Sequence, residues 1–195
     1  MTDTNFALDN MDPLPSPASA DGIALAVSNG GGYVNMRCAP SDTAAINSMS
    51  ALLGQEIPLE PNTFTEGRYT VFWLGPDEWL IVCDGDVRKL LDDLRRVANG
   101  HYASFVDVSD GMLCVTLAGP PVRDLLAKGC TLDLYEQQFG PGQCAQTLLA
   151  KAPVLLACSR QDASFQIHVR RSFAEYAVLW LRHAAAEFGI FAQQP

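Results

Sequence analysis

Basic residues are scarce in this 195-residue chain, which carries 13 Lys and Arg against 22 Asp and Glu and has a formal net charge of −9. Four of the acidic residues, Asp3, Asp9, Asp12 and Asp21, fall within residues 1–21, a segment that has no Lys or Arg. A protein that binds the phosphate backbone needs a basic face. We therefore expect no nucleic-acid partner.

Long hydrophobic runs are also missing. No stretch of 18 apolar residues occurs, and the apolar segment 148–158 is interrupted by Lys151 and Pro153. Because a membrane-spanning helix needs about 20 apolar residues, we expect no membrane span. The N-terminus has neither a basic start nor an apolar stretch, so we expect no secretory signal.

The cysteines lack the spacing of a metal site or a redox pair. No two of them are separated by two residues, and no His lies at ligand spacing from any of them. We therefore predict that the thiols are reduced and that the protein is cytoplasmic. We also predict that this chain binds no zinc. The cysteines are Cys38, Cys83, Cys114, Cys130, Cys144 and Cys158.

The histidines do not form a catalytic pattern. His168 lies in an alternating segment, on the face opposite Phe165 and Ile167, where we expect a half-exposed side chain with a structural role. His101 is expected in a loop, and His183 on the polar side of the last helix. None of the three is predicted to act as a general base.

Two further patterns have structural explanations. Cys130 follows Lys128, and a nearby lysine can lower the pKa of a thiol, but a helix that ends at Gly129 accounts for the same order of residues. The three glycines at 30–32 permit a tight turn, and no Lys-Ser/Thr follows them as in a phosphate-binding loop. We predict no catalytic, cofactor-binding or metal-binding residue in this chain.

Hydrophobic periodicity in the first half predicts the order strand, helix, strand, strand, helix. A short strand at 22–27 precedes this series. The expected elements are strands at 33–38, 68–74 and 78–83, a helix from a Ser41 cap to Gly54, and a helix from an Asp86 cap to Asn99-Gly100.

The second half repeats this order. Ser172 and Glu175 are spaced as a capping box at the start of the last helix. The expected elements are a strand at 112–117, a helix opened by Pro120-Pro121 and stopped by Gly129, strands at 144–158 (broken near Pro153) and 165–170, and a helix from Ser172 to Gly189. The apolar face of that last helix is expected to comprise Phe173, Tyr176, Ala177, Trp180, Leu181, Ala184 and Phe188.

Two copies of one element order predict a duplicated α+β fold, in which each half covers one face of an antiparallel sheet with its helices. The domain is expected at 22–189, with halves at about 33–100 and 105–189. Residues 1–21 are interpreted as an acidic, Pro-rich leader that is flexible on its own, and residues 190–195 as a short tail.

A partner surface is predicted from two kinds of residue. Trp73 and Trp79 flank the first hairpin, and Trp is enriched in interface hot spots, although packing in the core is the other explanation. Arg170 and Arg171 precede the last helix and can pair with a partner carboxylate or remain solvated.

Five strings, taken together and in order, resemble the gamma subunit of heterotetrameric sarcosine oxidase. The resemblance covers about residues 33–188 and leaves residues 1–21 outside. The strings are WLGPDEWL at 73–80, VDVSDG at 106–111, LAKGC at 126–130 with LDL at 132–134, CAQTLLAKAPVLL at 144–156, and RSFAEY at 171–176.

The resemblance implies a small subunit beside alpha, beta and delta chains, in a complex that oxidatively demethylates sarcosine to glycine with formation of hydrogen peroxide. With tetrahydrofolate as co-substrate, the one-carbon unit leaves as methylenetetrahydrofolate. FAD, covalently held FMN and NAD are implied in the large subunits, and zinc in the delta chain. The gamma chains are in turn similar to the folate-binding T-protein of the glycine cleavage system, whose duplicated α+β layers agree with the repeat.

Three interpretations follow from the resemblance. The first is a noncatalytic structural subunit of that oxidase. The second is a folate-binding module, and the third is the equivalent subunit of a related N-methyl amino acid dehydrogenase, such as one that acts on N-methylglutamate.

Overall fold

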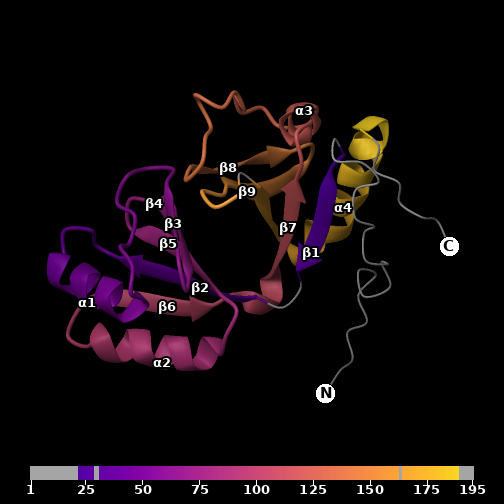
Figure 1. Ribbon diagram of the computed structural model, residues 1–195. Coiled ribbons are helices and arrows are strands. Elements are labelled where there is room, and N and C mark those ends of the chain that lie inside the picture. The colour runs from indigo at the N-terminus through magenta and orange to yellow at the C-terminus, as the bar shows by residue number, and fades with distance from the viewer. Residues whose placement is uncertain (1–21, 29–30, 163, 189–195) are drawn as a thin grey trace, which may run out of the picture.

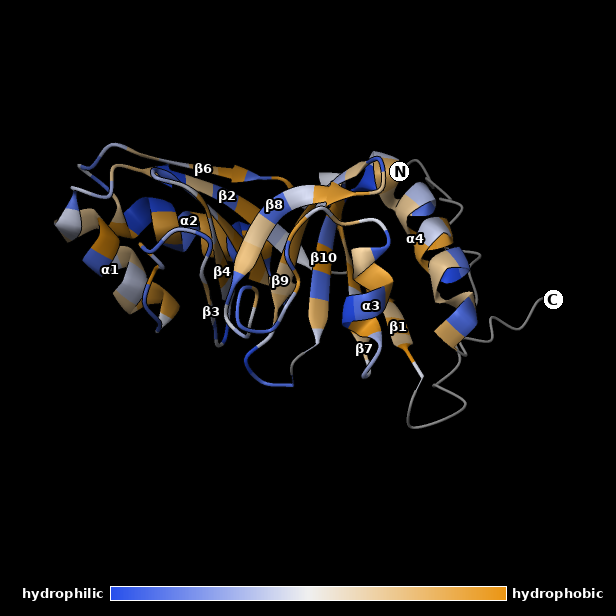
Figure 2. Cartoon of the chain, turned by 90° about the horizontal axis from the view of Figure 1, so that it is seen from above, coloured by the Kyte–Doolittle hydropathy of each residue, from blue (hydrophilic) through white to orange (hydrophobic). Residues whose placement is uncertain are grey.

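Two antiparallel sheets stack face to face between two pairs of helices in the computed structural model, which describes residues 22–28, 31–162 and 164–188. Helices α1 and α2 cover the outer face of one sheet, and α3 and α4 cover the outer face of the other (Figures 1 and 2). The α+β class and the helix-covered sheets are therefore confirmed. The leader 1–21 and the tail 190–195 lie outside the described residues.

The first sheet has the strand order β3-β4-β5-β2-β6. Residues that the periodicity assigned to strands and helices form them, and the structure adds two strands that were not predicted, β3 and β6. The elements are β2 (Gly32–Cys38), α1 (Thr43–Leu53), β3 (Phe64–Glu66), β4 (Thr70–Gly75), β5 (Glu78–Cys83), α2 (Val87–Val97) and β6 (Ala103–Asp107).

The second sheet has the order β8-β9-β10-β7-β1. Its outer face packs on α3 and α4, with a buried stripe of small and branched side chains from α4. The elements are β1 (Ala24–Ser28), the 3₁₀ turn η1 (Ser109–Gly111), β7 (Met112–Ala118), α3 (Val122–Ala127), β8 (Cys144–Leu149), β9 (Ala152–Cys158), β10 (Phe165–Arg170), α4 (Arg171–Ala185) and η2 (Ala186–Phe188).

The two sheets have the same order, but they exchange a strand. β6 follows α2 and pairs with β2, whereas the equivalent place beside β7 is filled by β1, which comes from the opposite end of the chain. β1 precedes both of the halves expected at 33–100 and 105–189. The second sheet is therefore completed only by a strand from outside its own half.

The helix ends are set by capping side chains and by glycine, and two of the predicted caps differ from the observed ones. Asp86 caps α2 by accepting from the backbone N–H of Arg88 and Lys89, as predicted, and Gly54 ends α1 in the left-handed conformation at φ 69°. The N-cap of α1 is Asp42, whose carboxylate accepts from Ala45 N at 3.1 Å, so the prediction of Ser41 is wrong by one residue.

The second correction concerns α4. The helix begins at Arg171 with Arg170 as its N-cap, so the predicted capping box at Ser172 is wrong. Its buried stripe also differs from the predicted one, because Phe173 and Tyr176 are exposed. The residues of α4 that face the sheet are Ala174, Ala177, Val178, Leu181 and Ala185.

The chain reverses between β8 and β9 at Ala150 and Lys151, where Ala150 has a φ of 51°. Pro153, where the break was predicted, lies inside β9 opposite Leu148 and is exposed. The pairing of β9 with β10 ends at Val154, so Pro153 has no partner on β10, and a residue without an N–H donor is tolerated at such a place.

At Gly119 the backbone of the second half lies close to the residues that lead into β1. The φ of Gly119 is 126°, and a Cβ at this position would clash with the carbonyl oxygen of Gly22, two residues before β1. We expect Gly119→Ala to lower the free energy of unfolding by roughly 2 kcal/mol or more, since it combines a strained backbone with displacement of β1.

Chemical denaturation of the full chain measures this loss. Gly85→Ala is the matched control, because no atom lies within 4 Å of a Cβ placed there and its φ is not in the left-handed region. Equal stability of the two variants would show that β1 does not depend on this approach.

Candidate functional site

A cavity of about 650 Å³ opens between the two sheets. Strands β2 and β5 of the first sheet and β8, β9 and β10 of the second line it, together with the connection from β6 to β7. Its floor is formed by buried side chains, among them Leu80, Leu155 and His168. Polar side chains surround the mouth, so the cavity has the mixed lining that is typical of small-molecule sites.

His168 is the buried polar residue at the centre of this region. Only 2% of it is exposed, so the prediction of a half-exposed side chain is wrong. The face of β10 that carries His168 is covered by the first sheet, where the Phe72 ring lies 4.8 Å from the imidazole centroid. A single strand's alternation cannot show that a second sheet covers its other face.

Both ring nitrogens of His168 have polar neighbours. Nδ1 lies 3.3 Å from the Tyr33 hydroxyl of the first sheet, and Nε2 lies 3.3 Å from Oε1 of Gln166. Burial lowers the pKa of His168 to about 4 and raises that of Tyr33 well above its ordinary value. At neutral pH both groups are therefore uncharged, which allows them to lie in the seam between the sheets.

Two of the carboxylates that line the cavity, Glu78 and Asp107, have hydrogen-bond partners. Glu78 accepts from Nδ2 of Asn35 at 2.8 Å and from Nη2 of Arg37 at 2.7 Å. Asp107 accepts from the backbone N–H and the hydroxyl of Ser109, and these hydrogen bonds hold its pKa below the usual range. These groups shape a polar entrance rather than an acid–base pair that shares a proton.

Two of the cysteines are held as neutral thiols by burial. Burial raises the pKa of Cys144 to about 12 and that of Cys114 to about 11, so both thiols are protonated at neutral pH. Lys128, which was considered as an activator of Cys130, instead donates to the carbonyl of Ala184 at 2.6 Å. All six cysteines lie in the described part of the chain and are free thiols.

Trp73 and Trp79, predicted for a partner surface, lie in the first half. Trp79 is fully buried, and its indole N–H donates to the carbonyl of Pro58 at 2.7 Å, so the prediction of a surface role is wrong for this residue. Trp73 is half-buried and packs on the same core. The strand pairing that places the two opposite each other puts their rings under the helices.

Arg170 and Arg171 lie at the junction of β10 and α4. Arg170 is exposed and lines the cavity, while Nε of Arg171 donates to the carbonyl of Asp110 at 2.9 Å. Arg170 is thus the one predicted site residue that the structure places at the cavity.

Residues that the sequence did not identify include Asn35 and Gln146. Gln146 donates through Nε2 to the carbonyl of Leu74 at 2.8 Å, which joins the two sheets at the mouth. No local pattern indicates Gln146, because it is exposed and its partner lies on a strand of the other sheet.

The described residues hold neither a metal-binding cluster nor a membrane-spanning helix. Within the described ranges, no three His, Cys, Asp or Glu side chains are placed to hold a metal ion. None of the helices described is both long and apolar enough to cross a membrane.

Residues 37–187 match the model of the sarcosine oxidase gamma subunit family. The chain belongs to this family. The matched segment contains the four α-helices and every described strand except β1 and most of β2.

Curated gamma subunits show the same relationship. The chain is 36% identical to sarcosine oxidase subunit gamma of Corynebacterium sp. (strain U-96) over 118 residues, which is 60% of this chain and 57% of that protein. It is 32% identical to the gamma subunit of Arthrobacter sp. over 158 residues, or 80% of this chain and 76% of that protein.

Two solved structures share the fold. A chain of the heterotetrameric sarcosine oxidase from Corynebacterium sp. U-96 superposes with a TM-score of 0.81 at 28% identity, covering 92% of this gamma-family chain and 91% of that one. The glycine cleavage system aminomethyltransferase T from Bartonella henselae superposes with a TM-score of 0.60 at 14% identity, covering 87% of this chain and 50% of that one. The predicted likeness to T-protein is therefore confirmed at the level of the fold.

The burial of His168 makes stability depend on pH. Its folded pKa of about 4 is below the ordinary 6.5, so the stability it contributes is present above pH 6.5 and is lost as the pH falls toward 4. We expect the free energy of unfolding to fall by about 2 kcal/mol between pH 7.5 and pH 5 on account of this residue.

Denaturant titrations at the two pH values measure this effect, with His168→Gln as the variant that cannot titrate. The aspartates with lowered pKa, such as Asp107, lose their contribution only below the ordinary carboxyl range, so they do not mask the effect at pH 5. An unchanged pH dependence in His168→Gln would contradict this assignment.

Proposed function

We propose that this chain is the gamma subunit of a heterotetrameric sarcosine oxidase, a complex that oxidatively demethylates sarcosine to glycine with formation of hydrogen peroxide. The observation that carries the proposal is the superposition over nearly the whole of both chains on a component of the Corynebacterium heterotetramer. The proposed partners are alpha, beta and delta subunits, and the proposed location is the cytoplasm, with which the six free thiols agree.

Within this complex we assign the chain a structural rather than a catalytic role. Its buried histidine is uncharged, the thiols of Cys114 and Cys144 stay protonated, and the cavity carboxylates Glu78 and Asp107 are engaged by neighbouring side chains. We place FAD, FMN and NAD in the large subunits and zinc in the delta subunit. Tetrahydrofolate is the proposed co-substrate that accepts the one-carbon unit as methylenetetrahydrofolate.

The alternative is that this chain is the equivalent subunit of a related N-methyl amino acid dehydrogenase. The substrate of the purified complex distinguishes the two enzymes. Turnover of sarcosine with uptake of oxygen supports the oxidase, and turnover of N-methylglutamate alone supports the dehydrogenase.

Co-expression with and without this chain tests the structural role. We expect the isolated chain to be colourless, and we expect its omission to lower the yield of assembled flavin-containing complex by roughly tenfold, since a subunit stabilises the partners that it binds. A flavin absorption spectrum from the isolated chain, or full assembly in its absence, would contradict the proposal.

A second candidate function is the binding of a small polar ligand, and the cavity between the sheets favours it. A volume of about 650 Å³ falls in the range of ligand pockets. The amides of Asn35 and Gln146 and the guanidinium of Arg170 can orient a folate-sized molecule above the apolar floor.

Calorimetry of the full chain with tetrahydrofolate tests this candidate. Saturable heat that is lost in Gln146→Trp, which narrows the mouth, but kept in Gln138→Trp, at an exposed position outside the cavity lining, supports binding there. A flat titration of the unmodified chain rules tetrahydrofolate out.

A further inference from the structure

Strand β6 forms one edge of the first sheet, and its outer side has no neighbouring strand among the described residues; Figure 2 shows it beyond β2. The N–H of Val108 donates to the carbonyl of Tyr33 at 2.9 Å, which fixes where the hydrogen bonds of the pairing with β2 fall. Hydrogen-bonded and non-hydrogen-bonded pairs alternate along an antiparallel ladder. Val106 therefore directs its backbone N–H and C=O toward β2, whereas Phe105 and Asp107 direct theirs outward.

The other sheet edges differ from that of β6. β3 has only three residues, and Thr63 just before it forms a bridge with Gln143, next to β8. β8 has a second bridge at its other end, between Leu149 and Cys130. β1 is followed at once by residues outside the described ranges. β6 contains neither proline nor lysine, and its pairing with β2 has no register shift, so it lacks these common protections of an edge strand.

Two apolar side chains at this edge are exposed. Val106 is 50% exposed and lies opposite Asn35, which lines the cavity. Tyr102, just before the strand, is 98% exposed, and Tyr is enriched in interface hot spots. A recess of about 390 Å³ lies beside Tyr102, with His101 and Arg37 in its lining. An added strand therefore finds unpaired backbone groups, apolar side chains to cover and room for a side chain of its own.

The carboxylate of Asp107 indicates the charge of the added strand. Its Oδ1 accepts both hydrogen bonds from Ser109, and its Oδ2 has no hydrogen-bond partner among the described residues. No Lys or Arg in the described ranges forms an ion pair with Asp107. A residue opposite Asp107 on an added strand places its Cβ about 5 Å away on the same face, within reach of a salt bridge. A basic residue at that place complements the edge.

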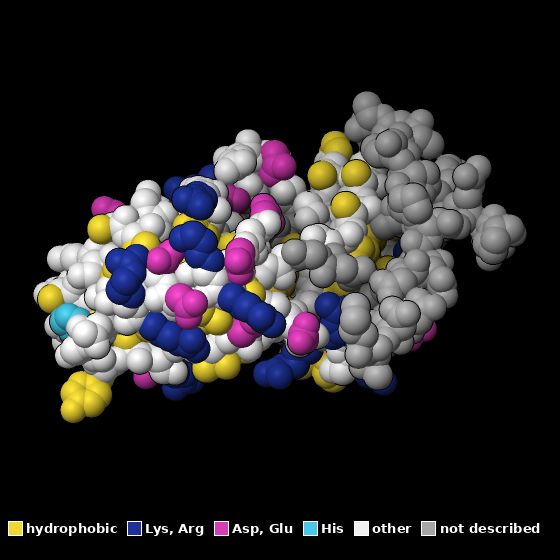
Figure 3. Space-filling model, turned by 90° about the horizontal axis from the view of Figure 1, so that it is seen from below, with side chains coloured by type: hydrophobic (Ala, Val, Ile, Leu, Met, Phe, Trp, Pro, Cys, Tyr) yellow, Lys and Arg dark blue, Asp and Glu magenta, His cyan; other side chains and the backbone are white. Residues whose placement is uncertain are grey.

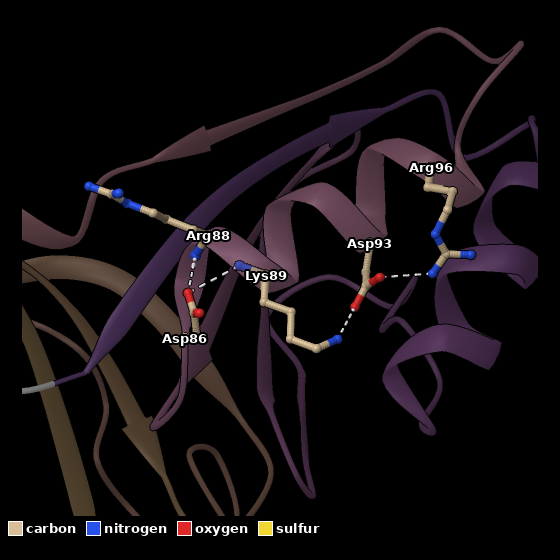
Figure 4. A network of polar contacts seen from close by, with 5 residues as sticks. All are labelled: Asp86, Arg88, Lys89, Asp93 and Arg96. Carbon is tan, nitrogen blue, oxygen red and sulfur yellow. Dashed lines mark hydrogen bonds and ion pairs between the residues drawn. The ribbon is translucent and has the colours of Figure 1, made fainter.

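Helix α2, which packs against β6, has a surface suited to water. Figure 3 shows basic and acidic side chains interspersed over this face. Asp93 accepts from Lys89 and from Arg96, both at 2.8 Å, and Asp86 caps the first turn (Figure 4). Paired charges of this kind stabilise a solvated helix. The outward face of α2 therefore provides a control surface beside the edge of β6.

We propose that β6 pairs along its free edge with an extended segment of another subunit of the complex, which adds a sixth strand to the first sheet. That segment accepts from the outward N–H groups of Phe105 and Asp107 and donates to their carbonyls. It carries a basic side chain opposite Asp107 and an apolar one beside Val106. This inference rests on the proposed function, since it takes its partner from the same complex.

A second copy of this chain fits the edge less well. Antiparallel pairing of two β6 strands about Phe105 places Asp107 opposite Ala103, which offers no positive charge. Each copy also carries a formal net charge of −9, so two copies repel each other. A basic segment of a different chain satisfies Asp107 and is attracted by the acidic protein.

Hydrogen exchange measured by mass spectrometry on the isolated chain and on the assembled complex tests the proposal. We expect the amides of Phe105 and Asp107 to exchange about tenfold more slowly, or slower still, in the complex, because a backbone acceptor then pairs with each of them. The amide of Val106 is paired with β2 in both states, and the α2 peptide 88–96 is expected to exchange equally in both. Unchanged exchange of Phe105 and Asp107 on assembly would overturn the added strand.

Two substitutions of Asp107 separate backbone pairing from side-chain contact. Asp107→Pro removes the outward N–H, which the pairing with β2 does not use, and proline is tolerated at such edge positions. Asp107→Ala removes the same carboxylate and keeps the N–H. With an affinity tag on this chain in cells that express all subunits, we expect Asp107→Pro to bind the other subunits about fivefold more weakly than Asp107→Ala, the effect of one lost backbone hydrogen bond.

The melting temperature of each isolated variant separates docking from folding. Should Asp107→Pro melt early, Tyr102→Ser repeats the test at an exposed side chain and is expected to lower retention of the other subunits. The control is Asp92→Arg/Arg95→Asp on α2, which changes two exposed side chains and is expected to retain the other subunits fully.

Several results would contradict the strand pairing while leaving the proposed function intact. These are equal retention by stably folded Asp107→Pro and Asp107→Ala, full retention by Tyr102→Ser, and a loss in the α2 control as large as in the β6 variants. A dimer of the isolated chain that Asp107→Pro dissociates identifies a second copy on this edge and also overturns the proposal. If the unaltered chain retains no other subunit, the proposed function itself fails.

Discussion

The contact between the two sheets, with His168, Tyr33 and Phe72 at its centre, is the constraint on which the rest of the structure depends. It buries an imidazole and a phenol that stay uncharged and close together, and it covers the second face of strands whose first face packs on helices. Because both faces are covered, β9 is buried along almost its whole length. The cavity adjoins this contact, because His168 lines it together with residues of β5 and β9.

The exchange of β1 and β6 makes the two sheets dependent on each other. Each sheet takes its last strand from a part of the chain that a simple division into halves would assign elsewhere. Unfolding one half therefore exposes an edge of the other sheet, and edges with unpaired backbone groups are unfavourable. The exchange of strands therefore fixes the position of the cavity walls and of α4 relative to the contact between the two sheets.

The polar side chains at the cavity and on α2 agree with the structural role proposed for this chain. His168 in the cavity is uncharged and Glu78 accepts from Asn35, while the paired charges of α2 suit a face in water. The outward face of α4 is mixed, because Tyr176 and Leu179 are exposed there together with Glu175 and His183.

Much of the fold could be predicted from local patterns, because caps and periodicity act within a few residues. Asp86 and Gly54 mark helix ends by their own hydrogen bonding and backbone freedom, and the hairpin of β4 and β5 follows from alternation around a turn. β3 was missed because three residues are too few to show a period, and β6 because its alternation is short and its outward residues are mixed. The mouth residues Asn35 and Gln146 were missed because their partners come from distant strands.

The sequence by itself determined the repeated order of elements, the helix-covered sheets and the family. The tertiary structure alone decided that the free faces of the two sheets meet, which buries His168, that Trp79 lies in the core, and that Phe173 and Tyr176 face outward. The physical reason is that periodicity shows which side of an element is apolar, whereas burial depends on which other element covers that side.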